Sequence, residues 1–189
     1  MKRHRQKLLN LLVLAIAAIA VKLNYSSVGQ YRVASTEESG EIIRAYLEAE
    51  HTNPLLVSSY FGIESVAGLS AEYARGPADS LDIPSGLMDF VSQASSEGSL
   101  PDFVLSRYPS ITPAEAKALP NTRYYEEMFK RFSGNVCVQV SQPVVSSDGI
   151  ALFAYSRYSG ELNGDIGWVV CGRTNGKWTF QQTKLVLIS

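Results

Sequence analysis

The sequence predicts an α+β protein in which a helical N-terminal half packs on a four-stranded antiparallel C-terminal meander. Three observations support this fold class. Apolar residues recur at helical spacing before residue 134, they alternate as in strands after residue 135, and Asn175-Gly176 is the strongest hairpin signal in the chain. The 189 residues are enough for one domain of ordinary size but not for two.

Residues 1–21 form the first element, which we expect to be an export segment. Residues 1–7 are basic, and residues 8–21 are apolar with one exception. This run suits a secretory signal peptide, which needs roughly 7 to 15 apolar residues, better than a membrane span, which needs about 20. Ala18-Ile19-Ala20 fits a cleavage site before Val21. An uncleaved N-terminal transmembrane anchor is the equal alternative, and in both cases the rest of the chain is exported.

The charge balance changes once this segment is set apart. The chain has 17 basic and 18 acidic residues, a net charge of −1. Four of the basic residues lie in residues 1–7, so the remainder has 13 basic and 18 acidic residues, a net charge of −5. Nucleic acids and anionic membrane surfaces both require a basic partner surface. We therefore expect no nucleic-acid partner, and membrane contact only through residues 8–21 if they are uncleaved.

Residues 22–34 mix polar residues with isolated apolar ones and are expected to be a tether. A single exported domain follows over 35–189, mainly helical over 35–134 and a β-sheet over 135–189. Ser35-Thr36-Glu37-Glu38 has the form of a capping box, which predicts a helix that ends near His51. The apolar face of this helix comprises Ile42, Ile43, Tyr46 and Leu47.

The next segments are less regular. Residues 55–61 are ambiguous between a strand and a short helix, 62–84 are expected to be an irregular connection, and a helix is plausible after Ser85. Thr112-Pro113-Ala114-Glu115 starts a short helix that Pro120 ends. A last helix follows Asn121, with Tyr125, Met128, Phe129 and Phe132 as its apolar stripe and Gly134 as its left-handed end.

Four strands are predicted, over residues 136–140, 150–158, 166–173 and 177–188. Pro143 limits the first to an edge of the sheet or marks its end. Counting outward from Asn175-Gly176 places Arg173 opposite Trp178, Cys171 opposite Phe180 and Val169 opposite Gln182. The apolar phase slips after Phe180, which predicts a bulge near Gln181-Gln182.

Few residues could carry catalysis. His51 is the only histidine outside the export segment, so any Ser-His or Cys-His system would need it, and a polar position at a helix end is its favoured role. Glu126 and Glu161 could act as general acid or base. The loop with Glu161, Asn163 and Asp165 lacks a fourth acid for calcium. We expect no metal and no cofactor, because the chain also has no phosphate-binding glycine loop or dinucleotide motif.

Two cysteines and a group of tyrosines complete the candidates. Cys137 and Cys171 could pair in a disulfide in an oxidising compartment, or remain two small buried residues of the sheet. Aromatic surfaces can bind peptides or glycans, but we favour the rim of a core for these tyrosines. The tyrosines in or near the second strand and the helix before the sheet are Tyr124, Tyr125, Tyr155 and Tyr158.

A resemblance covers residues 136–189. Its motifs are Ser141-Gln142-Pro143, Ala151, Gly160-Glu161-Leu162-Asn163-Gly164 with Gly167, Gly176-Lys177-Trp178 and Ile188-Ser189. In these motifs the segment resembles the C-terminal sheet of small exported bacterial proteins of unassigned function. Members of that group often carry cysteines in the loop, where this chain has Ser159 and Asn163. The resemblance implies export and a sheet, and it implies no activity.

The sequence therefore predicts a non-enzymatic module of the bacterial cell envelope or of the secreted fraction. It is expected to be periplasmic or secreted, or held at the inner membrane by its N-terminal helix, and to bind an envelope protein or a small ligand. Two alternatives stay open. One is a carboxylate-dependent hydrolase of envelope glycans or peptides, and the other is a domain that holds a small ligand between its sheet and its helices.

Overall fold

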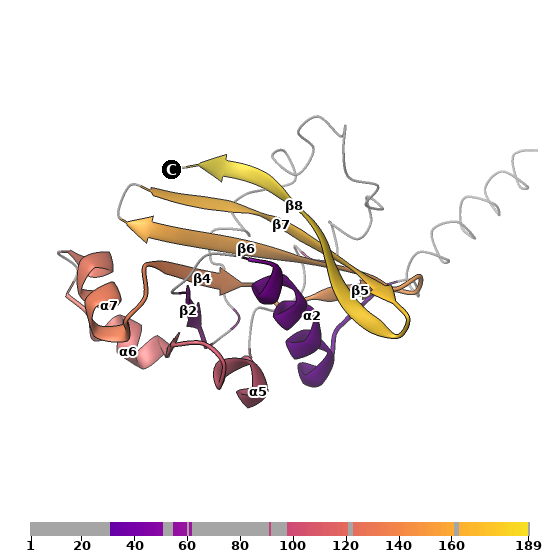
Figure 1. Cartoon of the computed structure of the whole chain (residues 1–189), viewed down its shortest axis with the longest axis horizontal. Coiled ribbons are helices and arrows are strands. Elements are labelled where there is room, and N and C mark those ends of the chain that lie inside the picture. The colour runs from indigo at the N-terminus through magenta and orange to yellow at the C-terminus, as the bar shows by residue number, and fades with distance from the viewer. Residues whose placement is uncertain are drawn as a thin grey trace, which may run out of the picture.

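A computed structural model describes residues 31–50, 55–59, 61, 91, 98–120, 123–160 and 163–188. They form an α+β fold in which a curled, mixed sheet dominates (Figure 1). The strands are β1 (Tyr31–Val33), β2 (Leu55–Ser58), β3 (Ser110–Ile111), β4 (Val136–Val140), β5 (Val144–Ser146), β6 (Ile150–Gly160), β7 (Asn163–Thr174) and β8 (Lys177–Ile188). The helices are α2 (Thr36–Ala49), α5 (Asp102–Leu105), α6 (Pro113–Lys117) and α7 (Tyr124–Phe132).

The strand order shows that the predicted arrangement of a helical half on a four-stranded meander is wrong. Over the described residues the sheet has eight strands, and β2 and β3 come from residues 35–134, which are predicted to be mainly helical with only 55–61 left open between a strand and a helix. One edge of β6 pairs with β5 and then with β4, while its other edge pairs with β7. Strand β2 lies parallel to both β3 and β4. All four residues of β2 are buried, as expected for a strand with neighbours on both edges and cover on both faces.

The structure corrects the predicted tether and decides between the two interpretations of Pro143. β1 lies within residues 22–34, which were expected to be a tether, and it pairs antiparallel with β5 through Val33 and Val144. Three residues of mixed polarity carry too little periodicity to indicate an edge strand. β4 is not an edge strand, because β2 and β6 flank it. It ends at Val140, so Pro143 follows the end of the strand, which was the other interpretation.

Helix α2 follows its sequence signals closely. The Ser35 hydroxyl accepts a hydrogen bond from the Glu38 backbone N–H at 3.3 Å, which confirms the N-cap. The Glu38 carboxylate does not complete the capping box, because it takes two hydrogen bonds from Arg32, at 2.6 and 2.9 Å. The predicted apolar face is buried. It packs on one face of the sheet against β7 and β8.

The β7–β8 hairpin confirms most of the predicted register. Asn175 and Gly176 have φ values of 51° and 79°, as a type I′ turn requires. Arg173 pairs with Trp178 and Cys171 with Phe180, as counted from the turn. The predicted bulge is present between Val170 and Cys171. It inserts Gln181 and moves the partner of Val169 from the expected Gln182 to Thr183.

Two apolar clusters of described residues lie on opposite faces of the sheet. The larger cluster lies under α2 and includes Leu55 and Val57 of β2. The smaller one lies under α6 and α7 and includes Leu56 of β2 and Cys137 of β4. Successive side chains of a strand point to opposite faces, so Leu56 lies in the smaller cluster while its neighbours Leu55 and Val57 lie in the larger one. Figure 1 shows α6 and α7 gathered near the start of β4, apart from α2.

Helix α7 ends differently from the prediction. Ser133, and not Gly134, takes the left-handed conformation, with φ of 55°. Gly134 serves close packing, because a Cβ there would lie 2.7 Å from the Leu56 Cβ. The helix start predicted at Thr112 is confirmed at α6. The Thr112 hydroxyl accepts from the Glu115 N–H, and the Glu115 carboxylate accepts from the Thr112 N–H, so the two residues form a capping box.

Candidate functional site

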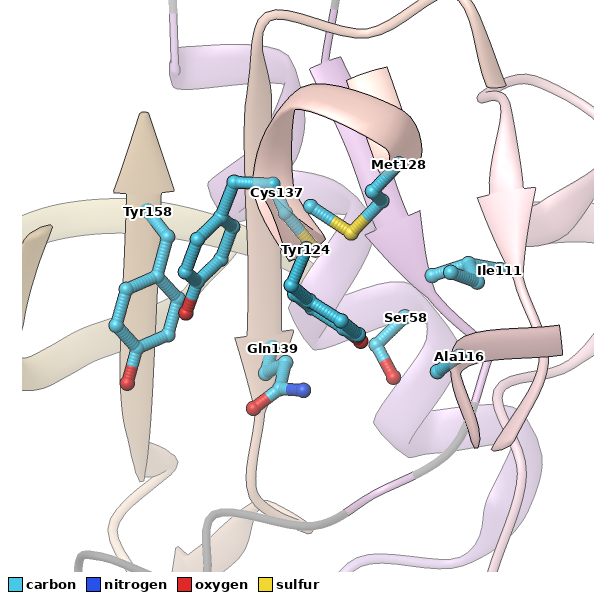
Figure 2. A pocket seen from close by; sticks show the side chains of 9 residues that line it. Ser58, Ile111, Ala116, Tyr124, Met128, Cys137, Gln139 and Tyr158 are labelled. Atoms are coloured by element: carbon cyan, nitrogen blue, oxygen red, sulfur yellow. The ribbon is translucent and has the colours of Figure 1, made fainter. Parts of the chain in front are cut away.

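A pocket of about 180 Å³ lies between the sheet and helices α6 and α7, on the face of the smaller apolar cluster (Figure 2). Side chains from four strands, β2, β3, β4 and β6, form its floor, and side chains from the two helices form its cover. The lining residues are Ser58, Ile111, Ala116, Tyr124, Tyr125, Met128, Cys137, Gln139 and Tyr158.

The strand register explains why these floor residues meet. Cys137 pairs with Leu56 on one side and with Tyr158 on the other, so the three side chains share a face. Ser58 and Gln139 lie two residues after Leu56 and Cys137 on their own strands and therefore point to the same face. Alternation along β2 and β4 thus places two polar side chains beside an apolar row.

Three tyrosine rings line the pocket. The rings of Tyr125 and Tyr158 stack with centroids 5.5 Å apart and an interplanar angle of 29°. The ring of Tyr124 meets that of Tyr125 edge-on, at 5.2 Å and 90°. The Tyr158 ring covers its cross-strand partner Gly164, where a Cβ would lie 2.7 Å from the Tyr158 Cδ1. Because paired aromatic rings hold a preferred geometry, the pocket has walls of defined shape.

The polar groups of the pocket are neutral. Cys137 is buried, and burial raises the pKa of its thiol to about 12, so the thiol is protonated at neutral pH and is a poor nucleophile. The Ser156 hydroxyl donates to Oε1 of Gln139 at 3.5 Å. None of the nine lining residues carries a charge. The pocket therefore suits an uncharged group, since a buried charge without a partner is costly.

A second, more open pocket of about 370 Å³ lies on the opposite face, beside Tyr155, Arg157 and Asp165. Arg157 donates to both oxygens of Asp165, at 2.8 and 3.1 Å, and to Glu50 at 3.1 Å. The Tyr155 hydroxyl donates to Asp165 at 2.8 Å. These groups satisfy one another and join the end of α2 to β6 and β7, so their arrangement is that of a structural clamp.

The structure does not bring the predicted catalytic candidates together. His51 and Glu161 lie outside the described residues. Glu126 is exposed, lies 3.8 Å from Arg123, and does not line the tyrosine pocket. Among the residues that the structure describes, no group of three His, Cys, Asp or Glu side chains could hold a metal ion, and no helix is long and apolar enough to span a membrane. Residues 1–21, predicted to be the export segment, are also outside the described part.

Cys137 and Cys171 are both free and buried. Cys137 pairs with Tyr158 on one edge of β6, and Cys171 pairs with Ala151 on the other. The two partner residues on β6, Ala151 and Tyr158, are seven residues apart, which corresponds to about 23 Å at ~3.3 Å per residue. Because seven is odd, the two cysteine side chains lie on opposite faces of the sheet. The Cα atoms of a disulfide lie within about 7 Å of each other. The structure thus separates the pair that the sequence allowed to form a disulfide.

The tyrosines divide between the two faces. Tyr124, Tyr125 and Tyr158 line the pocket, whereas Tyr155 belongs to the larger cluster under α2. The sequence favours the rim of a core for all four, and only the helical stripe with Met128 indicates that Tyr125 faces the sheet. Ser58 and Gln139 were not predicted as site residues, and the period-two alternation of β4 was the one signal that could have located Gln139.

Comparisons with known proteins found no match among protein-family models, curated proteins or solved structures.

Proposed function

We propose that this chain is a non-enzymatic binding module whose tyrosine pocket holds one uncharged group of a partner protein or a small ligand. The observation that carries the proposal is the lining itself. Three tyrosine rings, two sulfur-containing side chains and the neutral side chains of Ser58 and Gln139 surround about 180 Å³ of space. Binding sites of this composition combine apolar walls with a few polar groups that orient the ligand.

The alternative of a carboxylate-dependent hydrolase has weaker support. A general acid or base must reach the group that it protonates or deprotonates, within hydrogen-bond distance or through one water. Glu126 lies on the exposed side of α7 and forms its ion pair with Arg123 there. No carboxylate is among the described residues that line the pocket. Binding between sheet and helices, which the sequence left open as a third hypothesis, is therefore the better match to the geometry.

A pair of substitutions on α6 tests the binding function. Ala116 lines the pocket, whereas Ala114 is exposed on the same helix. We expect neutral aromatic fragments to bind the full chain in saturation-transfer NMR, and Ala116→Leu to abolish this binding by filling the pocket. Ala114→Leu is the matched control and should bind as the natural chain does. If Ala116→Leu leaves fragment binding unchanged, or if no fragment binds, the pocket is not the binding site.

A hydrolysis screen tests the non-enzymatic part of the proposal. The purified full chain is assayed against envelope glycans and peptides, together with Glu126→Ala and Glu161→Ala variants. We expect no turnover by any of the three proteins. Turnover that disappears in either variant, with the fold intact by circular dichroism, would replace the binding module with a hydrolase.

Export to the cell envelope or beyond is the other part of the proposal, and it rests on residues 1–21. The mass of the native protein and its cell fraction test it directly. We expect either a chain that begins at Val21 in a soluble exported fraction or a full-length chain in the membrane fraction. Full-length protein in the soluble cytoplasmic fraction would contradict export.

A further inference from the structure

The pocket also limits the chemistry of its occupant, and this inference rests on the proposed binding function. Its volume of about 180 Å³ is close to the ~150 Å³ of an engineered apolar cavity that binds benzene, and it is well below the ~300 Å³ at which sites for larger ligands begin. One six-membered ring with a small substituent therefore fills it.

The walls favour an aromatic ring over an aliphatic one. Because the Tyr124 and Tyr125 rings meet at 90°, a ring edge and a ring face adjoin at this wall. Aromatic guests pack edge-to-face or offset against such rings. Met128 and Cys137 add sulfur atoms, and sulfur makes favourable contacts with aromatic rings. Figure 2 shows the Met128 sulfur directed toward the space between Cys137 and Tyr124.

The polar side of the pocket calls for a hydrogen-bond acceptor on the occupant. Because the Ser156 hydroxyl donates to Oε1 of Gln139, the amide nitrogen of Gln139 is turned the other way. In Figure 2 this nitrogen points toward the side of the pocket where Ser58 lies. An amide nitrogen is a donor only, so the matching ligand group is an acceptor. It is a neutral acceptor, since none of the described lining residues carries a charge that would balance a carboxylate.

We infer that the pocket binds a neutral aromatic ring with a single hydrogen-bonding oxygen substituent, of which a phenol is the simplest case. A tyrosine side chain of a partner peptide and a free phenolic molecule both present this chemistry. The ring occupies the space beside Met128 and Cys137, and its oxygen accepts from the Gln139 amide.

Matched probes test the inference on the full chain by NMR titration. p-Cresol and toluene have the same ring and methyl group and differ in one hydroxyl. We expect p-cresol to bind about three to ten times more tightly than toluene, which is the effect of one net hydrogen bond. 4-Methylcyclohexanol, which keeps the hydroxyl and loses the aromatic ring, should bind more weakly than p-cresol. Gln139→Leu should remove the preference for p-cresol over toluene, whereas Gln182→Leu on β8 should keep it.

The outcomes separate the inference from the proposed function. If p-cresol and toluene bind equally to the natural chain, the inference is wrong and the binding function stands. If no neutral fragment binds, both are wrong. Nuclear Overhauser contacts between p-cresol and the Met128 methyl group test the position of the ring without any substitution, and their absence in the bound state would also overturn the inference. Binding of N-acetyltyrosinamide would identify a peptide source, and binding of p-cresol alone would identify a free phenolic ligand.

Discussion

The ring of Tyr155 in β6 lies directly opposite Gly167 in β7 and covers the position that a Cβ would occupy there. A Cβ on Gly167 would lie 2.8 Å from Tyr155 Cε1 and would also press on the backbone carbonyl of Lys184 in β8. The absence of a side chain lets the Tyr155 ring lie across the strand, and its hydroxyl reaches Asp165 two residues away on β7 at 2.8 Å. The glycine is thus a packing requirement of the sheet.

This contact predicts that Gly167→Ala is destabilising. The added methyl group meets backbone on one side and a buried ring on the other, and overpacking of this kind costs about 1–3 kcal/mol of the free energy of unfolding. Gly160→Ala in β6 is the control, because no atom of the part of the chain that the structure describes lies within 4 Å of its added Cβ. Urea unfolding followed by circular dichroism measures both. Equal midpoints for the two variants would show that β7 shifts to accept the methyl group.

Two buried tyrosines differ in the state of their hydroxyl groups. The Tyr46 hydroxyl is buried and has no hydrogen-bond partner among the described residues, whereas the Tyr155 hydroxyl donates to Asp165. A buried polar group without a partner costs free energy. Tyr46→Phe is therefore expected to leave the free energy of unfolding unchanged or to raise it by up to about 1 kcal/mol, while Tyr155→Phe should lower it by about 1–3 kcal/mol. The reverse order, measured by urea unfolding, would mean that Tyr46 has a partner.

Arg157 joins three elements through Asp165 and Glu50. Arg157→Met keeps much of the apolar stem but leaves two carboxylates without their cation, so we expect a loss of about 1–3 kcal/mol in the free energy of unfolding. The matched control is Arg107→Met, since Arg107 is 55% exposed and bonds Glu48 at 2.9 Å. An exposed pair of that kind contributes at most about 1 kcal/mol. Thermal unfolding should show a clearly lower midpoint for Arg157→Met than for Arg107→Met, and equal midpoints would exclude the clamp.

The buried thiols predict a loss of stability in alkaline solution. Burial raises the pKa of Cys137 and of Cys171 from 9.0 to about 12. The folded state favours the protonated thiol. The contribution of each thiol to the free energy of unfolding is therefore complete below pH 9 and is lost as pH rises from 9 to about 12. Within that range each thiol lowers the free energy of unfolding by about 1.4 kcal/mol for every unit by which the pH rises.

Urea unfolding between pH 8 and 11 measures this slope. A Cys137→Ala/Cys171→Ala double variant loses packing at every pH, but its stability should fall less steeply above pH 9 than that of the natural chain. The comparison of slopes removes the contribution of the buried tyrosines, which both proteins share. Parallel curves would mean that the thiols are accessible in the folded state.

Local features of the chain were predictable. The positive φ values of Asn175 and Gly176 and the N-caps at Ser35 and Thr112 are confirmed. Each depends on residues within one turn of helix or one hairpin loop. The register was correct as far as Phe180 and then wrong by one residue at Val169, because the exact position of a bulge depends on how the side chains pack beyond it.

The candidate site was only partly predictable. The apolar stripe of α7 indicated that Tyr125 and Met128 face the sheet, but it did not indicate which strand residues they meet. Ser58 and Gln139 reach the pocket through the pairing of β2 and β6 with β4. Residues 55–57 and 136–138 pair in parallel across about 80 positions of sequence, and no local pattern reports such a pairing.

By itself the sequence determined the α+β class, the N-caps, the apolar faces of α2 and α7 and the β7–β8 hairpin, because each follows from propensity and periodicity over a few residues. Only the tertiary structure decided the eight-strand order, the burial of β2, the separation of Cys137 from Cys171 and the tyrosine pocket. These features depend on which distant segments pair and on which face of the sheet each helix covers. The apolar surface that the chain buries as a whole determines both.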